Sequence, residues 1–313
     1  MKKLITLSGP TASGKTKLGV MLAKQYDGEV VSCDSMQLYR GMAIGTAAPT
    51  AEETEGIPHH MIGVAEPSEQ WSVARFVQEA DGCIQDILAR GRQPILVGGT
   101  GLYMDALLRC NAFAKGESGG EVREGLTKRL ADEGIEPLYK ELQSIDSDAA
   151  ARLSLNDHKR ILRALEVYYE SGSTITAHNA ATQRIPPKYE AIRLALAFED
   201  REDMKRLIDE RVSRMAEAGL KDEVKALYQK DIPADATAWQ AIGYKEFRAV
   251  YEGRAREAEA LDEIRLRSRQ YAKRQLTWLR RTENLHWILW GKERDFAWGL
   301  QKATEIITAE GLD

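Results

Sequence analysis

The sequence predicts an α/β protein in which a parallel sheet is flanked by helices and interrupted by an all-helical insertion. Three observations predict this fold. Short apolar strands alternate with amphipathic helices over residues 4–108. A linker-like stretch at residues 115–120 then opens a segment with helical patterns only. A strand pattern returns at residues 192–198 and is followed by further helices. Near-continuous apolar strands joined by helices are typical of a parallel sheet with both faces covered.

Apolar runs and helical periodicities predict the core elements in order. Leu4–Leu7 is a short apolar strand, and Leu18, Met21 and Leu22 recur at the spacing of a helix over residues 15–26. The same alternation predicts a strand at residues 29–32, a helix at 73–90 that Gly91 ends, a strand at 94–97, a helix from residue 102, a strand at 192–198, helices through residue 281, a strand at 286–290 and a final helix.

The helical segment in the middle of the chain is predicted to form its own domain. Residues 121–170 show helical patterns, with Ser154 as the N-cap of a helix that runs to Glu170 and Asp157 three residues after the cap. Pro186 and Pro187 precede the returning strand. We therefore expect a core domain at residues 1–113 and 191–313 and a helical insertion domain at residues 114–190.

Composition excludes several classes of protein. The chain has 313 residues, 43% hydrophobic and 29% charged, which suits one or two globular domains. No apolar run reaches the roughly 18–20 residues of a membrane-spanning helix. The net charge of -4 provides no overall basic field, so a nucleic acid would need a local patch. Three widely spaced cysteines argue against disulfides and zinc knuckles. We expect a cytoplasmic monomer without membrane contact, in which His59 and His60 are structural.

Residues 9–16 carry the clearest chemical signal. They read Gly-Pro-Thr-Ala-Ser-Gly-Lys-Thr, which fits the motif G-x-x-x-x-G-K-[ST], and they lie between a predicted strand and a predicted helix. In this motif backbone N–H groups surround a phosphate, Lys15 adds a positive charge, and Thr16 can hold Mg²⁺. The sequence therefore predicts a P-loop NTPase-like core that binds a diphosphate or triphosphate. An ordinary glycine-rich turn is the simpler alternative.

The metal-holding aspartate of a nucleotide hydrolase is missing. The strand at residues 94–97 continues into Gly-Gly-Thr-Gly without a carboxylate, whereas the strand at 29–32 is followed by Asp34. Because ligands bind at the carboxyl ends of parallel strands, we expect Asp34 and Thr100 to face Lys15 across one cleft. Asp34 can act as a general base or hold a metal indirectly, or it can merely cap a turn. Thr100 can belong to a tight turn.

A basic stretch near the C-terminus is the second strong signal. Residues 264–281 contain seven Lys or Arg residues and no acid. Helical spacing places on one face Arg267, Tyr271, Arg274, Trp278 and Arg281. Such a face suits the phosphates and stacked bases of RNA, although a solvated helix face explains a charge run equally well. Lys159, Arg160 and Arg163 form a weaker cluster in the insertion.

Taken together, these motifs resemble the tRNA dimethylallyltransferase (isopentenyltransferase) family. The matching stretches run in family order at residues 9–16, 34–40, 44–46, 58–60, 97–103, 156–165, 241–246 and 271–280. Asp34-Ser-Met-Gln and Lys273-Arg-Gln-Leu-Thr-Trp are the most specific of them.

This resemblance implies a reaction and a role for each matching residue. The reaction transfers a dimethylallyl group from dimethylallyl diphosphate to N6 of adenosine 37, beside the tRNA anticodon, with Mg²⁺ as cofactor. The implied catalytic residues are Asp34, which accepts the N6 proton, and Thr100, which orients the diphosphate. The donor would contact Gly9, Pro10, Thr11, Ala12, Ser13, Gly14, Lys15, Thr16 and Arg211, with Thr16 as the metal ligand. The anticodon stem-loop would contact Ser35, Met36, Gln37, Lys159, Arg160, Arg163, Gln240, Gly243, Tyr244, Lys245, Lys273, Arg274, Gln275, Trp278 and Arg280.

Three other functions are compatible with parts of these motifs. A small-molecule or nucleotide kinase would bind ATP at residues 9–16, but it has no use for the basic aromatic helix. A non-catalytic RNA-binding protein would not need an intact Lys15, Thr16 and Asp34. A prenyltransferase acting on free adenine nucleotides would share the donor site, but not the long basic C-terminal region.

Overall fold

The computed structural model describes residues 3–110 and 120–312. The predicted linker and the expected boundary after residue 113 therefore lie outside the described residues, apart from Gly120. The chain divides into two compact units, one of residues 1–110 with 188–313 and one of residues 111–187. Lys188 and Tyr189 contact Asp81 of the first unit and belong to it, which ends the insertion at Pro187.

The first unit contains a six-stranded sheet with the order β3-β2-β4-β1-β5-β6, and every neighbouring pair is parallel. The strands are β1 (Leu4–Ser8), β2 (Gly28–Ser32), β3 (His59–His60), β4 (Gln93–Gly98), β5 (Ala191–Phe198) and β6 (Leu285–Trp290). The helices are α1 (Lys15–Gln25), α2 (Ala43–Thr46), α3 (Ala51–Thr54), α4 (Val73–Ala89), α5 (Gly101–Arg109), α11 (Arg201–Glu217), α12 (Leu220–Tyr228), a 3-10 turn (Thr237–Gln240), α13 (Tyr244–Tyr251), α14 (Glu257–Leu279) and α15 (Phe296–Ala309). The predicted α/β class is confirmed, and the five predicted strands lie within one residue of their predicted ends.

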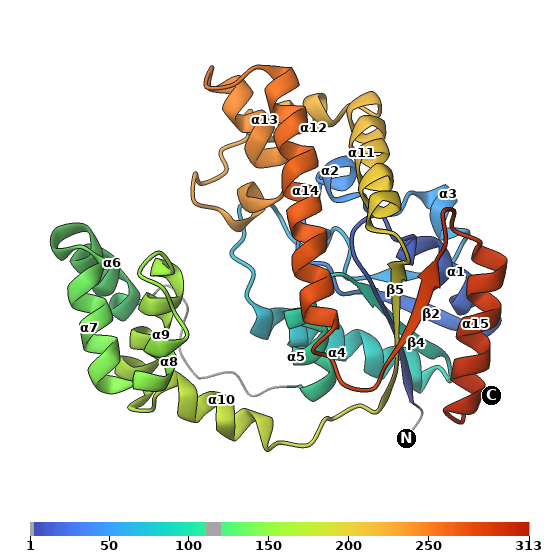
Figure 1. The fold of residues 1–313 in the computed structure, drawn as a ribbon, viewed down its shortest axis with the longest axis horizontal. Coiled ribbons are helices and arrows are strands. Elements are labelled where there is room, and N and C mark those ends of the chain that lie inside the picture. The colour runs from blue at the N-terminus through green and yellow to red at the C-terminus, as the bar shows by residue number, and fades with distance from the viewer. Residues whose placement is uncertain (1–2, 111–119, 313) are drawn as a thin grey trace. The chain divides into compact units, whose positions relative to one another are not determined.

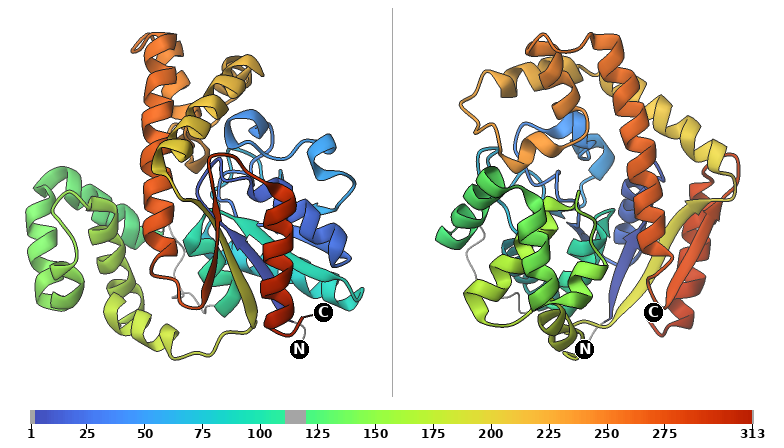
Figure 2. Two further views of the ribbon diagram at one scale, coloured as in Figure 1. Left: turned by 45° about the vertical axis from the view of Figure 1, so that its right-hand side comes forward. Right: turned by 60° about the vertical axis from the view of Figure 1, so that its left-hand side comes forward.

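Helices cover both faces of this sheet (Figures 1 and 2). On one face, α1 and α15 pack their apolar side chains, among them Leu22 and Ile307, against β1, β4, β5 and β6. On the other face α4 and α5 pack near β2 and β4, and α11 and α14 cover Ala195 and Ala197 of β5. Fully burying an aliphatic side chain contributes about 1.5–3 kcal/mol, so these two layers hold the strands in place. No helix in the described part of the chain is long and apolar enough to cross a membrane.

The strand register brings three chain segments to one edge of the sheet. Ser8 of β1 lies beside Gly98 of β4, and Ser32 of β2 lies beside Val97 of the same strand. The residues that follow β1, β2 and β4 therefore leave the sheet side by side at its carboxyl edge, where parallel sheets bind ligands.

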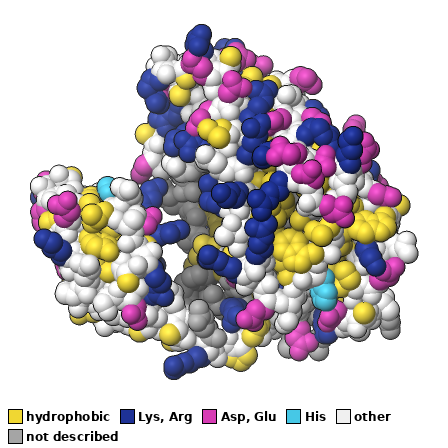
Figure 3. All heavy atoms as spheres, in the orientation of Figure 1, with side chains coloured by type: hydrophobic (Ala, Val, Ile, Leu, Met, Phe, Trp, Pro, Cys, Tyr) yellow, Lys and Arg dark blue, Asp and Glu magenta, His cyan; other side chains and the backbone are white. Residues whose placement is uncertain are grey.

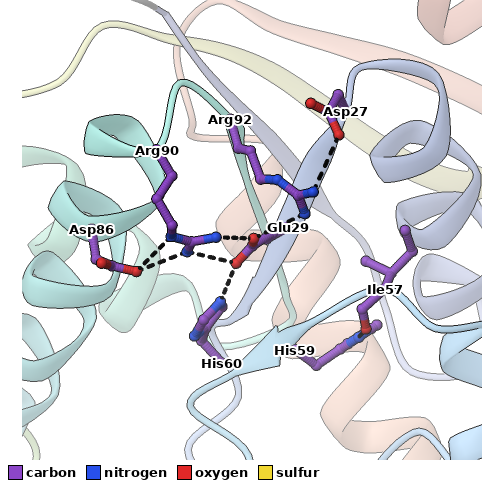
Figure 4. A network of polar contacts seen from close by, with 8 residues as sticks. All are labelled: Asp27, Glu29, Ile57, His59, His60, Asp86, Arg90 and Arg92. Atoms are coloured by element: carbon purple, nitrogen blue, oxygen red, sulfur yellow. Dashed lines mark hydrogen bonds and ion pairs between the residues drawn. The ribbon is translucent and has the colours of Figure 1, made fainter.

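A charged network stabilises the opposite edge (Figure 4). Glu29 of β2 is buried, and its carboxylate forms a two-pronged ion pair with Arg90, the residue that follows α4. His60 of β3 contacts the same carboxylate through Nε2 at 2.7 Å, and Arg92 approaches it at 3.2 Å. The two-residue β3, which the sequence does not predict, is thus tied to β2, and the structural role expected for His60 agrees with this contact.

The second unit is a small helical domain. Its helices are α6 (Glu121–Glu133), α7 (Ile135–Ile145), α8 (Ser147–Ala151), α9 (His158–Ser171) and α10 (Ile175–Gln183). Leu126, Leu138 and Leu165 belong to its apolar core. The predicted N-cap at Ser154 is wrong, because α9 begins four residues later, at His158. The Asp157 carboxylate accepts hydrogen bonds from both the N–H and the hydroxyl of Ser154, at 3.1 and 3.2 Å, which closes a turn ahead of the helix.

Candidate active site

The loop between β1 and α1 has the backbone conformation that a phosphate cradle needs. Gly14 has a φ of 87°, and a Cβ there would lie 2.8 Å from the ring of Phe296. Trp290 donates a hydrogen bond to the Ser13 carbonyl at 2.8 Å, and Arg294 donates to the Ala12 carbonyl at 3.1 Å. The loop is therefore braced from the β6–α15 connection, and the N–H groups that begin α1 mark an anion site.

Lys15 lies folded over this loop. Its Nζ donates to the carbonyls of Gly9 and Pro10 at 2.9 and 2.8 Å. Burial and the nearby Arg211 guanidinium outweigh the opposing effect of Asp34, and they lower the pKa of Lys15 from 10.5 to about 7. The predicted donor residues Lys15 and Arg211 thus lie together, and Asp34 lies close enough to influence both.

Asp34 follows β2 and holds the loop that it begins. Its Oδ1 accepts hydrogen bonds from the backbone N–H groups of Met36 at 2.9 Å and Gln37 at 3.4 Å. This is the turn-capping role that the sequence leaves open as the simpler alternative. No hydrogen bond within the described residues reaches Oδ2. One oxygen fixes the carboxylate, and the other is available to accept a proton.

Thr100 connects the end of β4 to the Asp34 loop. It occupies the N-cap position of α5, but its side chain makes no bond to that helix. Its Oγ1 accepts instead from the N–H of Ser35 at 3.2 Å, and its own N–H donates to the Cys33 carbonyl at 3.2 Å. At Gly98 a Cβ would lie 2.3 Å from the Cys33 oxygen, so this approach requires glycine. The prediction that Asp34 and Thr100 lie near Lys15 agrees with these contacts.

Tyr271 is a site residue that our sequence-based list of binding residues omits. It belongs to α14 and contacts Thr100 and Gln275, and burial together with the nearby Asp34 charge raises its pKa to about 12. The guanidinium of Arg274 lies 5.7 Å from the centre of its ring. The sequence offered one signal for this role, because Tyr271 lies on the predicted basic aromatic face of the helix. Tyr271 therefore offers a protonated hydroxyl beside the candidate base at neutral pH.

Gln275 is predicted to contact tRNA, but the structure shows its side chain buried and bonded within the protein. The residue is only 6% exposed. Its Oε1 accepts from the Thr11 N–H at 2.9 Å, and its Nε2 donates to the Gly99 carbonyl at 3.0 Å. Both ends of the amide thus bond to backbone groups, and they join the P-loop to the Thr100 turn.

Tyr244 and Gly243, which are also predicted to contact tRNA, are both buried in the structure. The Tyr244 hydroxyl donates to Glu223 of α12, whose carboxylate also accepts from the N–H groups of Ile44 at 2.9 Å and Gly45 at 3.1 Å. Gly45 is necessary here, because a Cβ would lie 2.4 Å from the Tyr244 ring. This arrangement docks α2 onto α12 and α13. Glu223 is a residue that sequence reasoning missed.

The remaining residues predicted to bind tRNA differ in their exposure to solvent and in their ion pairs. The exposed ones in the first unit are Gln240, Lys245, Lys273, Arg274 and Arg280. Figure 3 shows Lys and Arg side chains gathered along α14. Arg265, Arg267 and Arg269 of this helix are paired with acids, whereas no ion pair involves Lys273, Arg274 or Arg280 among the described residues. Trp278 packs on Gly101 and donates to Asp105 at 3.0 Å.

Gln37 is bonded within the protein, and the predicted tRNA-binding residues of the insertion are either exposed or paired with an acid. The Gln37 amide is used internally, accepting from Ser32 at 2.9 Å and donating to the Ala47 carbonyl at 3.2 Å. In the second unit Lys159 and Arg160 are exposed, while Arg163 is paired with the buried Glu166 at 2.8 Å.

The described residues contain no group of three or more His, Cys, Asp or Glu side chains that could hold a metal ion. Thr16 lies in the first turn of α1, next to Lys15, and is partly exposed. This setting fits Mg²⁺ bound mainly by phosphate oxygens and water, because Mg²⁺ usually keeps several waters and few protein ligands.

Comparison with known proteins identifies the family. The family model for IPP transferase matches residues 37–282, and the model for isopentenyl transferase matches residues 2–62. The chain belongs to the IPP transferase family. It is 43% identical to the tRNA dimethylallyltransferase of Geobacillus thermodenitrificans over 92% of this chain and 90% of the relative. It is 44% identical to the enzyme of the same name from Bacillus velezensis, over 91% of this chain and 90% of that one.

Solved structures extend this comparison to the fold of the IPP transferase family. The tRNA isopentenylpyrophosphate transferase of Bacillus halodurans aligns with a TM-score of 0.71 and 39% identity over 99% of both chains. A eukaryotic dimethylallyltransferase described as acting on tRNA aligns with a TM-score of 0.83 and 30% identity, over 98% of this chain and 78% of that one. These likenesses confirm the predicted P-loop-like core.

Proposed function

We propose that this protein transfers a dimethylallyl group from dimethylallyl diphosphate to N6 of adenosine 37 in tRNA, releasing diphosphate. The observation that carries the proposal is the meeting of Lys15, Arg211, Asp34 and Thr100 at the carboxyl edge of the sheet. Relatives that match over nine-tenths of the chain are named for this reaction. In this setting the P-loop binds the donor diphosphate.

Each residue at this edge has a distinct part in the reaction. The P-loop N–H groups, Lys15 and Arg211 bind the diphosphate and stabilise the charge that develops on it as it leaves. Thr100, held by Ser35, orients the diphosphate, and Asp34 accepts the proton that the N6 amine loses as it attacks the allylic carbon. Thr16 would hold Mg²⁺ together with the donor phosphates, and the ion would supply positive charge at the leaving group. Adenosine 37 leaves its stack to reach this edge, which costs a few kcal/mol and favours a loop nucleotide.

The tRNA side of the proposal depends on cations that form no ion pair with the acids of the described residues. Lys273, Arg274 and Arg280 lie on or just beyond the helix that also places Tyr271 and Gln275 at the donor site. The anticodon stem-loop binds along this helix, and its phosphates contact these cations. We expect the enzyme to act as a monomer. A reducing cytoplasm suits its three free cysteines.

The deciding experiment is single-turnover transfer from labelled dimethylallyl diphosphate with Mg²⁺ and saturating acceptor. The acceptors are bulk tRNA and AMP, and label transfer to tRNA alone supports the proposal. Asp34→Asn keeps the shape of the side chain but removes the base, so the rate should fall by roughly 10²–10⁴-fold with both substrates still bound. The matched control is Asp222→Asn, an exposed acid on α12. Transfer to AMP but not to tRNA would refute the proposed substrate.

A further inference from the structure

A short helical turn near the candidate donor site is held at both ends by one pair of helices, and the proposed reaction uses only one residue of that pair. The turn is α2, and the pair is α11 and α12, which join at Gly219 with a left-handed φ of 97°. Helix α12 contacts both α11 and α2 (Figure 1). The two helices thus form a hairpin with α2 packed against it.

Glu223 of α12 holds the N-terminal end of this turn. Its carboxylate accepts hydrogen bonds from the N–H groups of Ile44 at 2.9 Å and Gly45 at 3.1 Å, and from the Tyr244 hydroxyl. The first N–H groups of a helix have no acceptor within the helix, so the carboxylate satisfies two of them. Tyr244 is fully buried, and burial and the bond to Glu223 raise its pKa, which keeps its hydroxyl protonated and donating. Three donors from α2 and α13 therefore meet on one side chain.

Arg211 of α11 holds the other end of the turn. Its Nη2 donates to the carbonyl of Thr46, a buried residue, at 3.3 Å. Among the described residues this is the only hydrogen bond of the guanidinium, and no acid there forms an ion pair with it. A guanidinium carries five N–H donors. One backbone carbonyl therefore sets its direction and leaves most of its donors for a ligand.

The direction of this guanidinium matters because it is one of two cations at the candidate diphosphate site. Arg211 lies close enough to Lys15 to lower its pKa, and the Asp34 charge acts on both cations. Arginine binds phosphate best through two parallel N–H bonds, and this fork is sensitive to the orientation of the guanidinium plane. A displacement of α2 would therefore turn the fork away from the position in which it can bind a diphosphate.

We propose that Glu223 is a positioning residue for diphosphate binding, because it holds α2 where the Thr46 carbonyl orients the Arg211 guanidinium. The inference rests on the proposed function in taking that diphosphate to be the donor's. An isolated turn of four residues is not stable in water, so α2 depends on tertiary bonds for its place. Without the Glu223 carboxylate, two backbone N–H groups and the Tyr244 hydroxyl lose their acceptor, and the Thr46 carbonyl is no longer fixed.

The first test measures equilibrium binding of inorganic diphosphate with Mg²⁺, which needs no catalysis. Glu223→Ala should raise the Kd about tenfold, whereas Glu223→Gln, which keeps one acceptor oxygen, should raise it about threefold. The matched control is Asp222→Ala, which removes the neighbouring exposed acid of α12 and should leave the Kd at the parental value. In an Arg211→Ala background the Glu223 substitutions should have almost no further effect. A tenfold loss that persists in this background would overturn the proposal, because it would not act through Arg211.

Gly45→Ala tests the same turn without changing the carboxylate. A Cβ there would lie 2.4 Å from the Tyr244 ring, so α2 and the ring cannot keep their places, and the diphosphate Kd should rise as in Glu223→Ala. Urea unfolding checks that each variant is folded, and kcat for tRNA at saturating donor should stay within about twofold of the parent. Parental diphosphate affinity in the folded variants, with or without a fall in kcat, would overturn the proposal. A parent that binds diphosphate but does not modify tRNA would refute the proposed function, while the binding test of Glu223 would stand.

Discussion

Replacing Gln275 with leucine should damage donor binding rather than tRNA binding. The substitution keeps a similar volume but removes both bonds of the buried amide, to the Thr11 N–H and to the Gly99 carbonyl. Each backbone group left unpaired in a buried place costs about 1–3 kcal/mol. Two fully buried groups would cost about 2–6 kcal/mol; because these two bonds are only partly buried, the free energy of unfolding should fall by about 2–4 kcal/mol. Because the P-loop loses its tie to the Thr100 turn, the donor Kd should rise about tenfold.

The assay combines urea unfolding with separate measurements of the donor and tRNA dissociation constants. The matched control is Thr277→Val on the same helix, because its exposed hydroxyl bonds only to the Lys273 carbonyl, at 2.8 Å. Gln275→Glu adds a signature of its own. A charged glutamate places an oxygen against the Gly99 carbonyl, whereas a protonated one donates to it, so donor binding should recover as the pH falls. Weakened tRNA binding with an unchanged donor Kd would refute this reasoning and make Gln275 an RNA contact.

Three further predictions follow from charges. Diphosphate favours the protonated form of Lys15, whose pKa in the free protein is about 7. The donor Kd should therefore rise about fivefold from pH 7 to pH 8, and calorimetry in two buffers should detect proton uptake on binding. Arg90 and His60 outweigh burial and lower the pKa of Glu29 from 4.5 to about 2. About 3 kcal/mol of stability is therefore present above pH 5 and is lost as the pH falls toward 2. Urea unfolding of Glu29→Gln should lack this pH dependence. Neutralising Arg274 and Arg280 together should lower the salt slope of tRNA binding by about 0.7–0.9 per lost phosphate contact, and leave donor binding intact.

Local signals were sufficient to predict the framework of the site. The apolar run at Leu4–Leu7 and the glycine and lysine spacing at residues 9–16 specify a strand, a loop and a helix without help from distant residues. The rule that parallel strands present ligands at their carboxyl ends then placed Asp34 and Thr100 near Lys15. Both residues are found there because β4 lies between β1 and β2 in the sheet.

The roles of the α14 residues could not be predicted in the same way. Helical periodicity states which side chains share a face, but not which element that face meets. Gln275 lies on a face that turns toward a loop more than 170 residues earlier in the sequence. The glycines on either side of Thr100 were an available signal. A Cβ on Gly99 would lie 2.1 Å from the Gln275 amide, and a Cβ on Gly101 would lie 2.2 Å from the Trp278 ring. Paired glycines that flank a functional residue indicate that another element approaches closely.

Tyr244 and Gln275 suggest why a family motif need not identify the residues that touch a ligand. Both belong to stretches by which this chain resembles its family, and both are buried where segments far apart in sequence meet. Substitution at such a crossing leaves an unpaired polar group or a clash, so the residue is constrained by the fold whatever the ligand contacts. An exposed cation has no such constraint, and it is better identified as an RNA contact when no acid among the described residues forms an ion pair with it. By that criterion Lys273, Arg274 and Arg280 are the first side chains of α14 and its C-terminal end to test against tRNA.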